Sequence, residues 1–85
     1  MKSFECVITD PVGMHARPAG KLVKEAKELD SKITVIKDDK EVDATKLMML
    51  MSLGIKKGDK IKVTIEGGDE DAAYDKMVNF FKENL

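Results

Sequence analysis

The chain has 85 residues with 15 basic and 16 acidic side chains, a formal net charge of -1 at pH 7, and a single cysteine and a single histidine. This length predicts one domain, residues 1–85, with one small core, and the balanced charge favours neither nucleic acid nor an anionic membrane as a partner. One cysteine and one histidine cannot form an internal disulfide or a closed zinc site, so we expect no metal, no cofactor and a reducing, cytoplasmic setting.

The first half of the chain predicts a strand, a helix and a hairpin. Apolar residues alternate with polar ones over residues 4–10, a pattern typical of a half-buried strand. Over residues 16–29 the apolar residues recur at helical spacing, which predicts an amphipathic helix. Residues 32–44 contain two short β-rich runs around Asp38 and Asp39, a turn-forming pair, so we expect a hairpin with a short second strand.

The second half predicts a short helix, a strand and a long helix. Residues 46–53 read as two helical turns, capped by Thr45 and stopped by Gly54. Residues 60–66 alternate as a strand, and the final helix follows the N-cap residue Asp69. The order is therefore βαββαβα. Both long helices can cover one face of an antiparallel sheet, which predicts a two-layer α+β domain.

The short helix over residues 46–53 is apolar nearly all round. At about 100° per residue, Leu50 and Leu53 share one face. The opposite face carries Leu47, Met48 and Met51. A domain this small covers one face only, so we expect the second face to be a docking site exposed to solvent, for which unbranched methionine is well suited. Met14, next to His15, has the same chemistry and is assigned to this site. The alternative is that the methionines fill gaps in the core, which is the commoner use of Met.

His15 is the single histidine and lies in the stretch GMHARPAG. Gly13 frees the backbone before it, and Pro18 suits the first turn of the helix that follows. An anion beside His15 would face the free backbone N–H groups of Ala16 and Arg17, the positive end of the helix dipole and the Arg17 guanidinium. The same dipole favours a neutral imidazole, whose nitrogen lone pair can attack a phosphoryl donor. The alternative is an N-cap-like histidine in an exposed loop, with no chemical role.

With these residues the chain resembles the histidine-containing phosphocarrier protein (HPr) family of the bacterial phosphoenolpyruvate-dependent sugar phosphotransferase system. GMHARPAG is similar to the family's phosphorylation motif and MSLGIKKGD to its second signature, and the likeness covers essentially the whole chain. The resemblance implies an open-faced β-sandwich, with a four-stranded antiparallel sheet covered on one face by helices. It implies a carrier rather than an enzyme, in which enzyme I phosphorylates His15 on Nδ1 and a sugar-specific enzyme IIA receives the phosphoryl group.

Carried over residue by residue, the resemblance makes His15 the phosphoryl acceptor and Arg17 the cation that stabilises the phosphoryl group. The apolar contacts for both partners are Leu47, Met48 and Met51. The sequence departs from the family at three positions. Met14 stands where Leu or Ile is usual, and Met49 replaces a frequent Gly and enlarges the apolar surface. Lys46 stands where Gram-positive members carry the serine phosphorylated by HPr kinase/phosphorylase, so we expect that regulatory site to be absent.

Two other classes of function stay open. One is an HPr-like interaction module that docks through its methionines without phosphoryl transfer, although the presence of both His15 and Arg17 argues against it. The other is a free-standing hydrolase or metal enzyme, for which the chain lacks a second histidine, a Walker-type loop and a nucleophile-elbow serine. We also expect a monomer. Neither a signal peptide nor membrane insertion is expected, because Glu5 and Asp10 interrupt the first apolar stretch.

Overall fold

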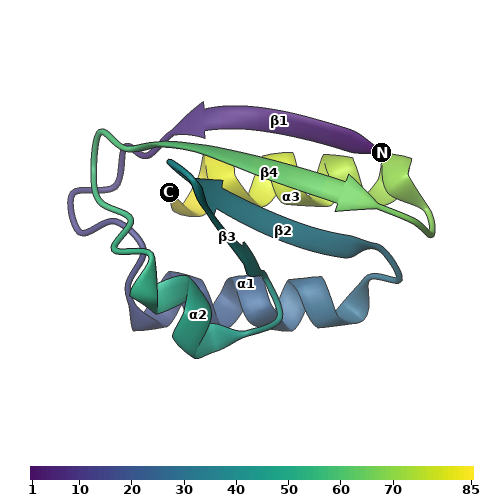
Figure 1. Cartoon of the computed structure of the whole chain (residues 1–85), viewed down its shortest axis with the longest axis horizontal. Helices are drawn as coiled ribbons and strands as arrows, with labels where there is room; N and C mark the ends of the chain where they lie inside the picture. The colour runs from purple at the N-terminus through teal and green to yellow at the C-terminus, as the bar shows by residue number, and fades with distance from the viewer.

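Seven elements follow one another in the predicted order in the computed structural model, which describes residues 1–85. They are β1 (Lys2–Val7), α1 (Ala16–Glu28), β2 (Lys32–Lys37), β3 (Lys40–Asp43), α2 (Leu47–Ser52), β4 (Lys60–Glu66) and α3 (Glu70–Asn84). The strands form one antiparallel sheet in the order β1-β4-β2-β3. Figure 1 shows α3 running along β1 and β4, and α1 along β2, with the short α2 beside α1. The predicted α+β fold, an open sheet with helices on one face, is confirmed.

The central strand β4 shows which face of the sheet is covered. Its residues Ile61, Val63 and Ile65 are buried, whereas the intervening Lys60 and Lys62 are exposed. The buried face packs against α1 and α3, and the opposite face, which carries Lys60 and Lys62, is open to solvent. Because side chains alternate strictly along a strand, this period-two pattern alone orients the sheet.

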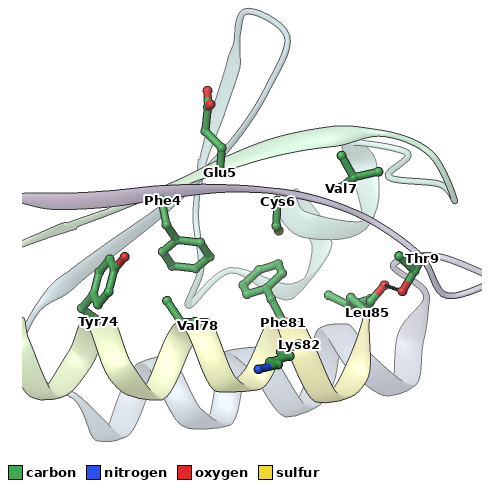
Figure 2. Close-up of a pocket in the computed structure, with 10 residues that line it drawn as sticks. All are labelled: Phe4, Glu5, Cys6, Val7, Thr9, Tyr74, Val78, Phe81, Lys82 and Leu85. Carbon is green, nitrogen blue, oxygen red and sulfur yellow. Dashed lines mark hydrogen bonds between the residues drawn. The ribbon is translucent and has the colours of Figure 1, made fainter.

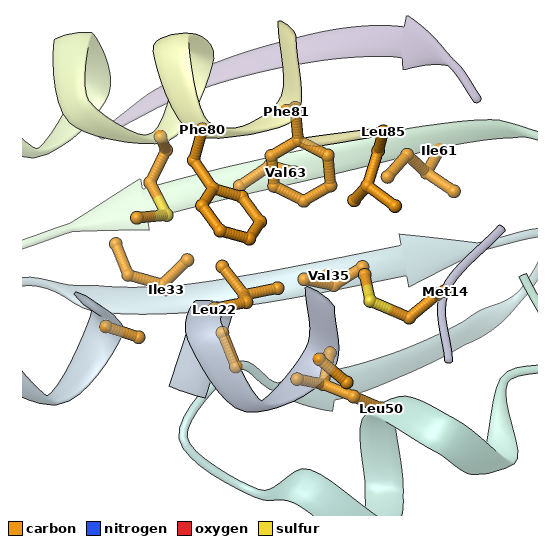
Figure 3. Packing of buried hydrophobic residues seen from close by; sticks show 14 of the residues in the cluster. Met14, Leu22, Ile33, Val35, Leu50, Ile61, Val63, Phe80, Phe81 and Leu85 are labelled. Carbon is orange, nitrogen blue, oxygen red and sulfur yellow. The ribbon is translucent and has the colours of Figure 1, made fainter. Parts of the chain in front are cut away.

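The core contains side chains from all three helices (Figure 3). Leu22 of α1, Leu50 of α2 and Phe80 of α3 are each at most 4% exposed. Met14 also belongs to this core, because only 6% of it is exposed, and Figure 3 shows its side chain directed towards Val35 of β2. The assignment of Met14 to an exposed docking site is therefore wrong.

The residues predicted to cap helices or to form a turn are Asp69, Asp38 and Thr45, and two of the three predictions hold. Asp69 caps α3 as expected, because its Oδ1 accepts a hydrogen bond from the Ala72 N–H at 3.1 Å. Asp38 turns the β2–β3 hairpin with a left-handed φ of 56°. The cap predicted at Thr45 is wrong. Lys46 occupies the N-cap position of α2 and makes no side-chain capping bond.

A cavity of about 400 Å³ lies between β1 and α3 and is mostly apolar (Figure 2). The Phe4 ring packs edge-to-face on Tyr74 and on Phe81, with centroids 5.6 and 5.9 Å apart. Cys6 faces the same space, and burial raises the pKa of its thiol. A thiol with a raised pKa is mainly protonated at neutral pH and is a poor nucleophile. Cys6 is thus a packing residue of this cavity.

Candidate functional site

His15 occupies the N-cap position of α1, as its extended backbone of φ -118° and ψ -170° indicates. Its carbonyl oxygen accepts the first bond of the helix, from the Ala19 N–H at 3.0 Å. Its side chain makes no capping hydrogen bond and is partly exposed. The imidazole is therefore free for chemistry instead of being used to hold the helix end.

Two backbone donors stand beside the imidazole. Ala16 and Arg17 are the first residues of α1, and their N–H groups precede the first intrahelical donor, Ala19. Pro18 lies between them and Ala19 and has no N–H to donate. N–H groups at the start of a helix point out of its end and bind anions. The N–H groups of Ala16 and Arg17, directly after His15, therefore have no acceptor within the helix.

A depression of about 260 Å³ surrounds His15. It is lined by His15, Arg17, Pro18 and Lys21 of the α1 region, by Asp10, and by Glu83 and Asn84 of α3. Neither Arg17 nor Lys21 has a carboxylate oxygen within 4.0 Å. Both cations are therefore open to an external anion. Lys21 was not among the predicted site residues, although its spacing of four residues from Arg17 places both side chains on one face of a helix.

The loop before His15 is fixed by Asp10, which was not among the predicted site residues either. Its carboxylate oxygen Oδ1 accepts the N–H groups of Val12 at 2.8 Å and Gly13 at 3.2 Å. Asp side chains commonly bond the backbone two residues further on, and an Asp that opens a D-P-x-G turn was a readable signal. The turn determines where the chain enters α1.

Gly13 makes a close approach to the loop between α2 and β4. Its φ is +77°, and a Cβ at this position would lie 2.5 Å from the Ile55 carbonyl oxygen and 2.8 Å from the Lys56 Cα. The next residue, Met14, donates its N–H to the same Ile55 oxygen at 3.0 Å. This contact joins the backbone before His15 to the loop between α2 and β4, next to a Met14 side chain that belongs to the core.

An apolar surface lies on α2, and we call it the α2 patch. It consists of Leu47, Met48, Met49 and Met51, which are 38%, 77%, 50% and 40% exposed. Leu50 and Leu53 on the other face are buried, as predicted. Core filling therefore does not account for these methionines. A cluster of exposed, unbranched apolar side chains is typical of a surface that contacts other proteins.

Two carboxylates, Asp43 before α2 and Asp59 after it, accept hydrogen bonds from neighbouring residues. Asp43 accepts the Thr45 hydroxyl at 2.7 Å and the Thr45 N–H at 2.8 Å, and these bonds lower the pKa of the Asp43 carboxyl. After the helix, hydrogen bonds from the Lys37 ammonium and the Lys56 N–H lower the pKa of Asp59. Both carboxylates are thus stabilised in their charged form by contacts that exist only in the folded chain.

The melting temperature is expected to fall as the pH is lowered from 6 towards 3. Each of these carboxyls has a lower pKa folded than unfolded, so its contribution to the free energy of unfolding is complete above the unfolded value of about 4. That contribution is lost as the pH falls through the folded value. Thermal melts against pH test this for the native chain and for Asp59→Asn, whose profile should be flatter. Asp39→Asn, at an exposed hairpin carboxylate without a side-chain hydrogen bond, should retain the native profile.

Comparison with known proteins shows the family of the chain. Residues 2–83 match the family model described as PTS HPr component phosphorylation site. The chain belongs to the HPr family. The phosphocarrier protein HPr of Mycoplasma capricolum subsp. capricolum is 42% identical over 73 residues, which cover 86% of this chain and 82% of that protein. HPr-C-His from Thermoanaerobacter tengcongensis is 39% identical with a TM-score of 0.90, and the match covers 96% of this chain and 92% of that one.

An HPr dimer from Thermoanaerobacter tengcongensis is also similar, with 38% identity, a TM-score of 0.76 and coverage of 98% of this chain and 95% of that one. Because an HPr relative forms a dimer, the expected monomer stays a prediction for this chain. The relatives named phosphocarrier protein HPr support the expected carrier role. None of the helices is long and apolar enough to cross a membrane.

Proposed function

We propose that this HPr-type chain accepts a phosphoryl group on His15 from phospho-enzyme I and donates it to a sugar-specific enzyme IIA. The observation that carries the proposal is the imidazole at the start of α1, with two backbone donors and two cations around it that have no anionic partner in the chain. The single cysteine favours a reducing cytoplasm as the place of this exchange.

In the accepting step, the Nδ1 lone pair of His15 attacks phosphorus. The bond between phosphorus and its donor atom on enzyme I breaks as the N–P bond forms, and the donor atom keeps the bonding electron pair. The negative phosphoryl oxygens are stabilised by the N–H groups of Ala16 and Arg17 and by the Arg17 and Lys21 side chains. Donation to enzyme IIA is the same step in reverse, with a nucleophile of enzyme IIA as the attacking group.

Both partners must bring a reacting group to the same atom, so they must bind in turn on overlapping surfaces. The α2 patch suits that requirement, because its methionine side chains adapt their shape to more than one partner. Arg17 and Lys21 belong to α1, which packs against α2. A partner that contacts both the patch and these cations would gain affinity from the apolar contact and orientation from the charges.

The proposal is tested by incubating the chain with phosphoenolpyruvate and enzyme I and measuring its intact mass. One phosphoryl group that is stable in alkali and labile in acid is the expected result, since a phosphohistidine hydrolyses in acid. An acid-stable ester on Ser or Thr would contradict the assignment of His15. Binding to enzyme I without any phosphoryl uptake would instead support the non-catalytic interaction module.

Charged substitutions in the α2 patch are expected to weaken binding without unfolding the chain. Met48→Glu and Met51→Glu place a carboxylate where an apolar contact is expected, which should raise the dissociation constant for enzyme I about tenfold or more. Both residues are exposed, so the melting temperature should stay near that of the native chain. Calorimetric binding and thermal melts measure the two effects. The matched control is Val7→Glu, at an exposed apolar residue of β1 outside the patch, which should leave binding unchanged.

The native chain is expected to take up no phosphate from ATP and an HPr kinase, because Lys46 has no hydroxyl. The nearby hydroxyls are engaged, with Thr45 donating to Asp43 at 2.7 Å and Ser52 donating to the Met49 carbonyl at 2.7 Å. Lys46→Ser should become a substrate, and its phosphate should place negative charge beside the α2 patch and oppose enzyme I. Mass spectrometry with site mapping decides the matter. Phosphate on Thr45 or Ser52 of the native chain would contradict the prediction.

A further inference from the structure

Lys37, the last residue of β2, reaches across to the segment that follows α2. Its Nζ lies 2.9 Å from the Asp59 Oδ2 and donates to the carbonyl oxygens of Gly54 at 2.9 Å and Leu53 at 3.4 Å. A lysine ammonium has three protons to donate, so these contacts satisfy the group completely. The side chains of Lys37 and Asp59 are only 21% and 29% exposed. The interaction is therefore better shielded and more directional than a typical surface ion pair.

The segment that Lys37 holds also supports the loop that carries His15. The Ile55 carbonyl accepts the Met14 N–H at 3.0 Å. At the other end of the segment, the Ile8 N–H donates to the Asp59 carbonyl at 2.9 Å and the Gly58 N–H donates to the Ile8 carbonyl at 2.8 Å. The same few residues thus join the end of α2, the end of β1 and the backbone before His15.

The α2 helix is short, and few of its residues are buried. It contains 6 residues, of which only Leu50 is buried, and its N-cap residue Lys46 makes no side-chain capping bond. A helix this short is not stable by itself. A cation at its C-terminal end interacts favourably with the last carbonyl groups. Lys37 supplies that cation from a neighbouring strand, so the orientation of the α2 patch depends on a rigid part of the sheet.

We infer that Lys37 is a positioning residue for phosphoryl exchange, which holds the α2 patch and the His15 loop in one fixed relation through the segment 53–59. This inference rests on the proposed function, because it assumes that a partner docks on the patch while its reacting group reaches His15. A partner bound to a displaced patch would present that group at the wrong place. Small misplacements of reacting groups are costly in group transfer.

The test replaces Lys37 with Met, which keeps much of the side-chain length and removes the ammonium group. The matched control is Lys40→Met, because Lys40 lies opposite Lys37 in the β2–β3 register and is exposed. Hydrogen exchange of the Met14 amide, relative to that of Val63 in the central strand, reports whether the His15 loop has loosened locally. Initial rates against phospho-enzyme I concentration report KM and kcat.

For Lys37→Met we expect Met14 exchange to accelerate about tenfold relative to Val63, and KM for enzyme I to rise about fivefold with a smaller change in kcat. Lys40→Met should change both by less than about twofold. Unchanged relative exchange of Met14 in Lys37→Met overturns the inference. So does accelerated exchange with an unaltered KM, because the loosened loop would then not matter for transfer.

A second variant keeps the test decisive if Lys37→Met does not fold. Asp59→Asn removes the ion pair and retains the donor–acceptor pair of Lys37 and Gly54, so it should shift Met14 exchange in the same direction by a smaller factor. Failure of the proposed function is distinguishable from failure of this inference. If the proposed function fails, native His15 takes up no phosphoryl group, whereas the amide exchange comparison is still measured and still tests the Lys37 contacts.

Discussion

Replacing His15 with Ala is expected to abolish phosphoryl uptake from phospho-enzyme I, a loss of more than about a thousandfold. The chain contains no second imidazole, and the backbone N–H groups at the start of α1 can bind a phosphoryl group but cannot accept it covalently. The fold should be unaffected, because the His15 side chain makes no capping hydrogen bond. Intact mass after incubation with phosphoenolpyruvate and enzyme I, together with a thermal melt, measures both effects.

Arg17→Ala is the companion variant, because it keeps the nucleophile and removes one stabilising cation. It should still take up one phosphoryl group, about a hundredfold more slowly, since a charged donor aimed at the transferred group acts mainly in the transition state. Uptake by His15→Ala at the native rate would assign the acceptor to another residue. An unchanged rate in Arg17→Ala would remove Arg17 from the stabilising set and leave Lys21 as the main cation.

Gly13→Ala is expected to lower the free energy of unfolding by at least about 2 kcal/mol, which corresponds to roughly 10 °C in melting temperature for a domain of this size. Two costs combine here. The φ of +77° disfavours any side chain, and the new Cβ would meet the Ile55 carbonyl oxygen at 2.5 Å and the Lys56 Cα at 2.8 Å. Both are backbone atoms, which cannot move aside as a flexible side chain would. Denaturant unfolding gives the free energy directly.

Gly54→Ala provides the matched comparison. Gly54 also has a positive φ, +63°, but a Cβ there would have nothing within 4 Å. It should therefore lose only the backbone term of about 1 kcal/mol. The difference between the two variants isolates the close approach of the loop before His15 to the segment after α2. Equal destabilisation would show that this approach does not constrain the chain.

The elements of the fold could be predicted because their signals are local. Alternation around Val63 identifies β4, and the Asp69 cap identifies the start of α3, and both depend on neighbouring residues in the sequence. The same holds for the two faces of α2, since helical spacing separates Leu50 from Met48. The position of His15 at the start of α1 was predictable for the same reason, from the Gly and Pro on either side of it.

The features that could not be predicted depend on contacts between distant segments. Met14 precedes a partly exposed histidine, and its burial accompanies a backbone bond to Ile55, 41 positions later in the chain. Lys37 reads as an ordinary polar strand residue, and its three acceptors come from a segment whose proximity no spacing rule reveals. Thr45 was predicted as the N-cap residue of α2, but its hydroxyl and its N–H donate to the Asp43 carboxylate instead. Competition among short polar side chains near a helix start is decided by geometry.

The place of β4 in the sheet has a consequence for synthesis of the chain. This strand lies between β1 and β2 and pairs with both, yet it spans residues Lys60–Glu66. While the ribosome makes the chain, β1 and β2 are therefore synthesised before the strand that lies between them. During this time no complete core covers their apolar sides. We expect β1 and the β2–β3 hairpin to be joined in one sheet only after residue 66 has emerged, because β1 and β2 both pair with β4 and contacts of long sequence separation form late. Until that moment the nascent chain is a candidate client for chaperones that bind exposed apolar strands.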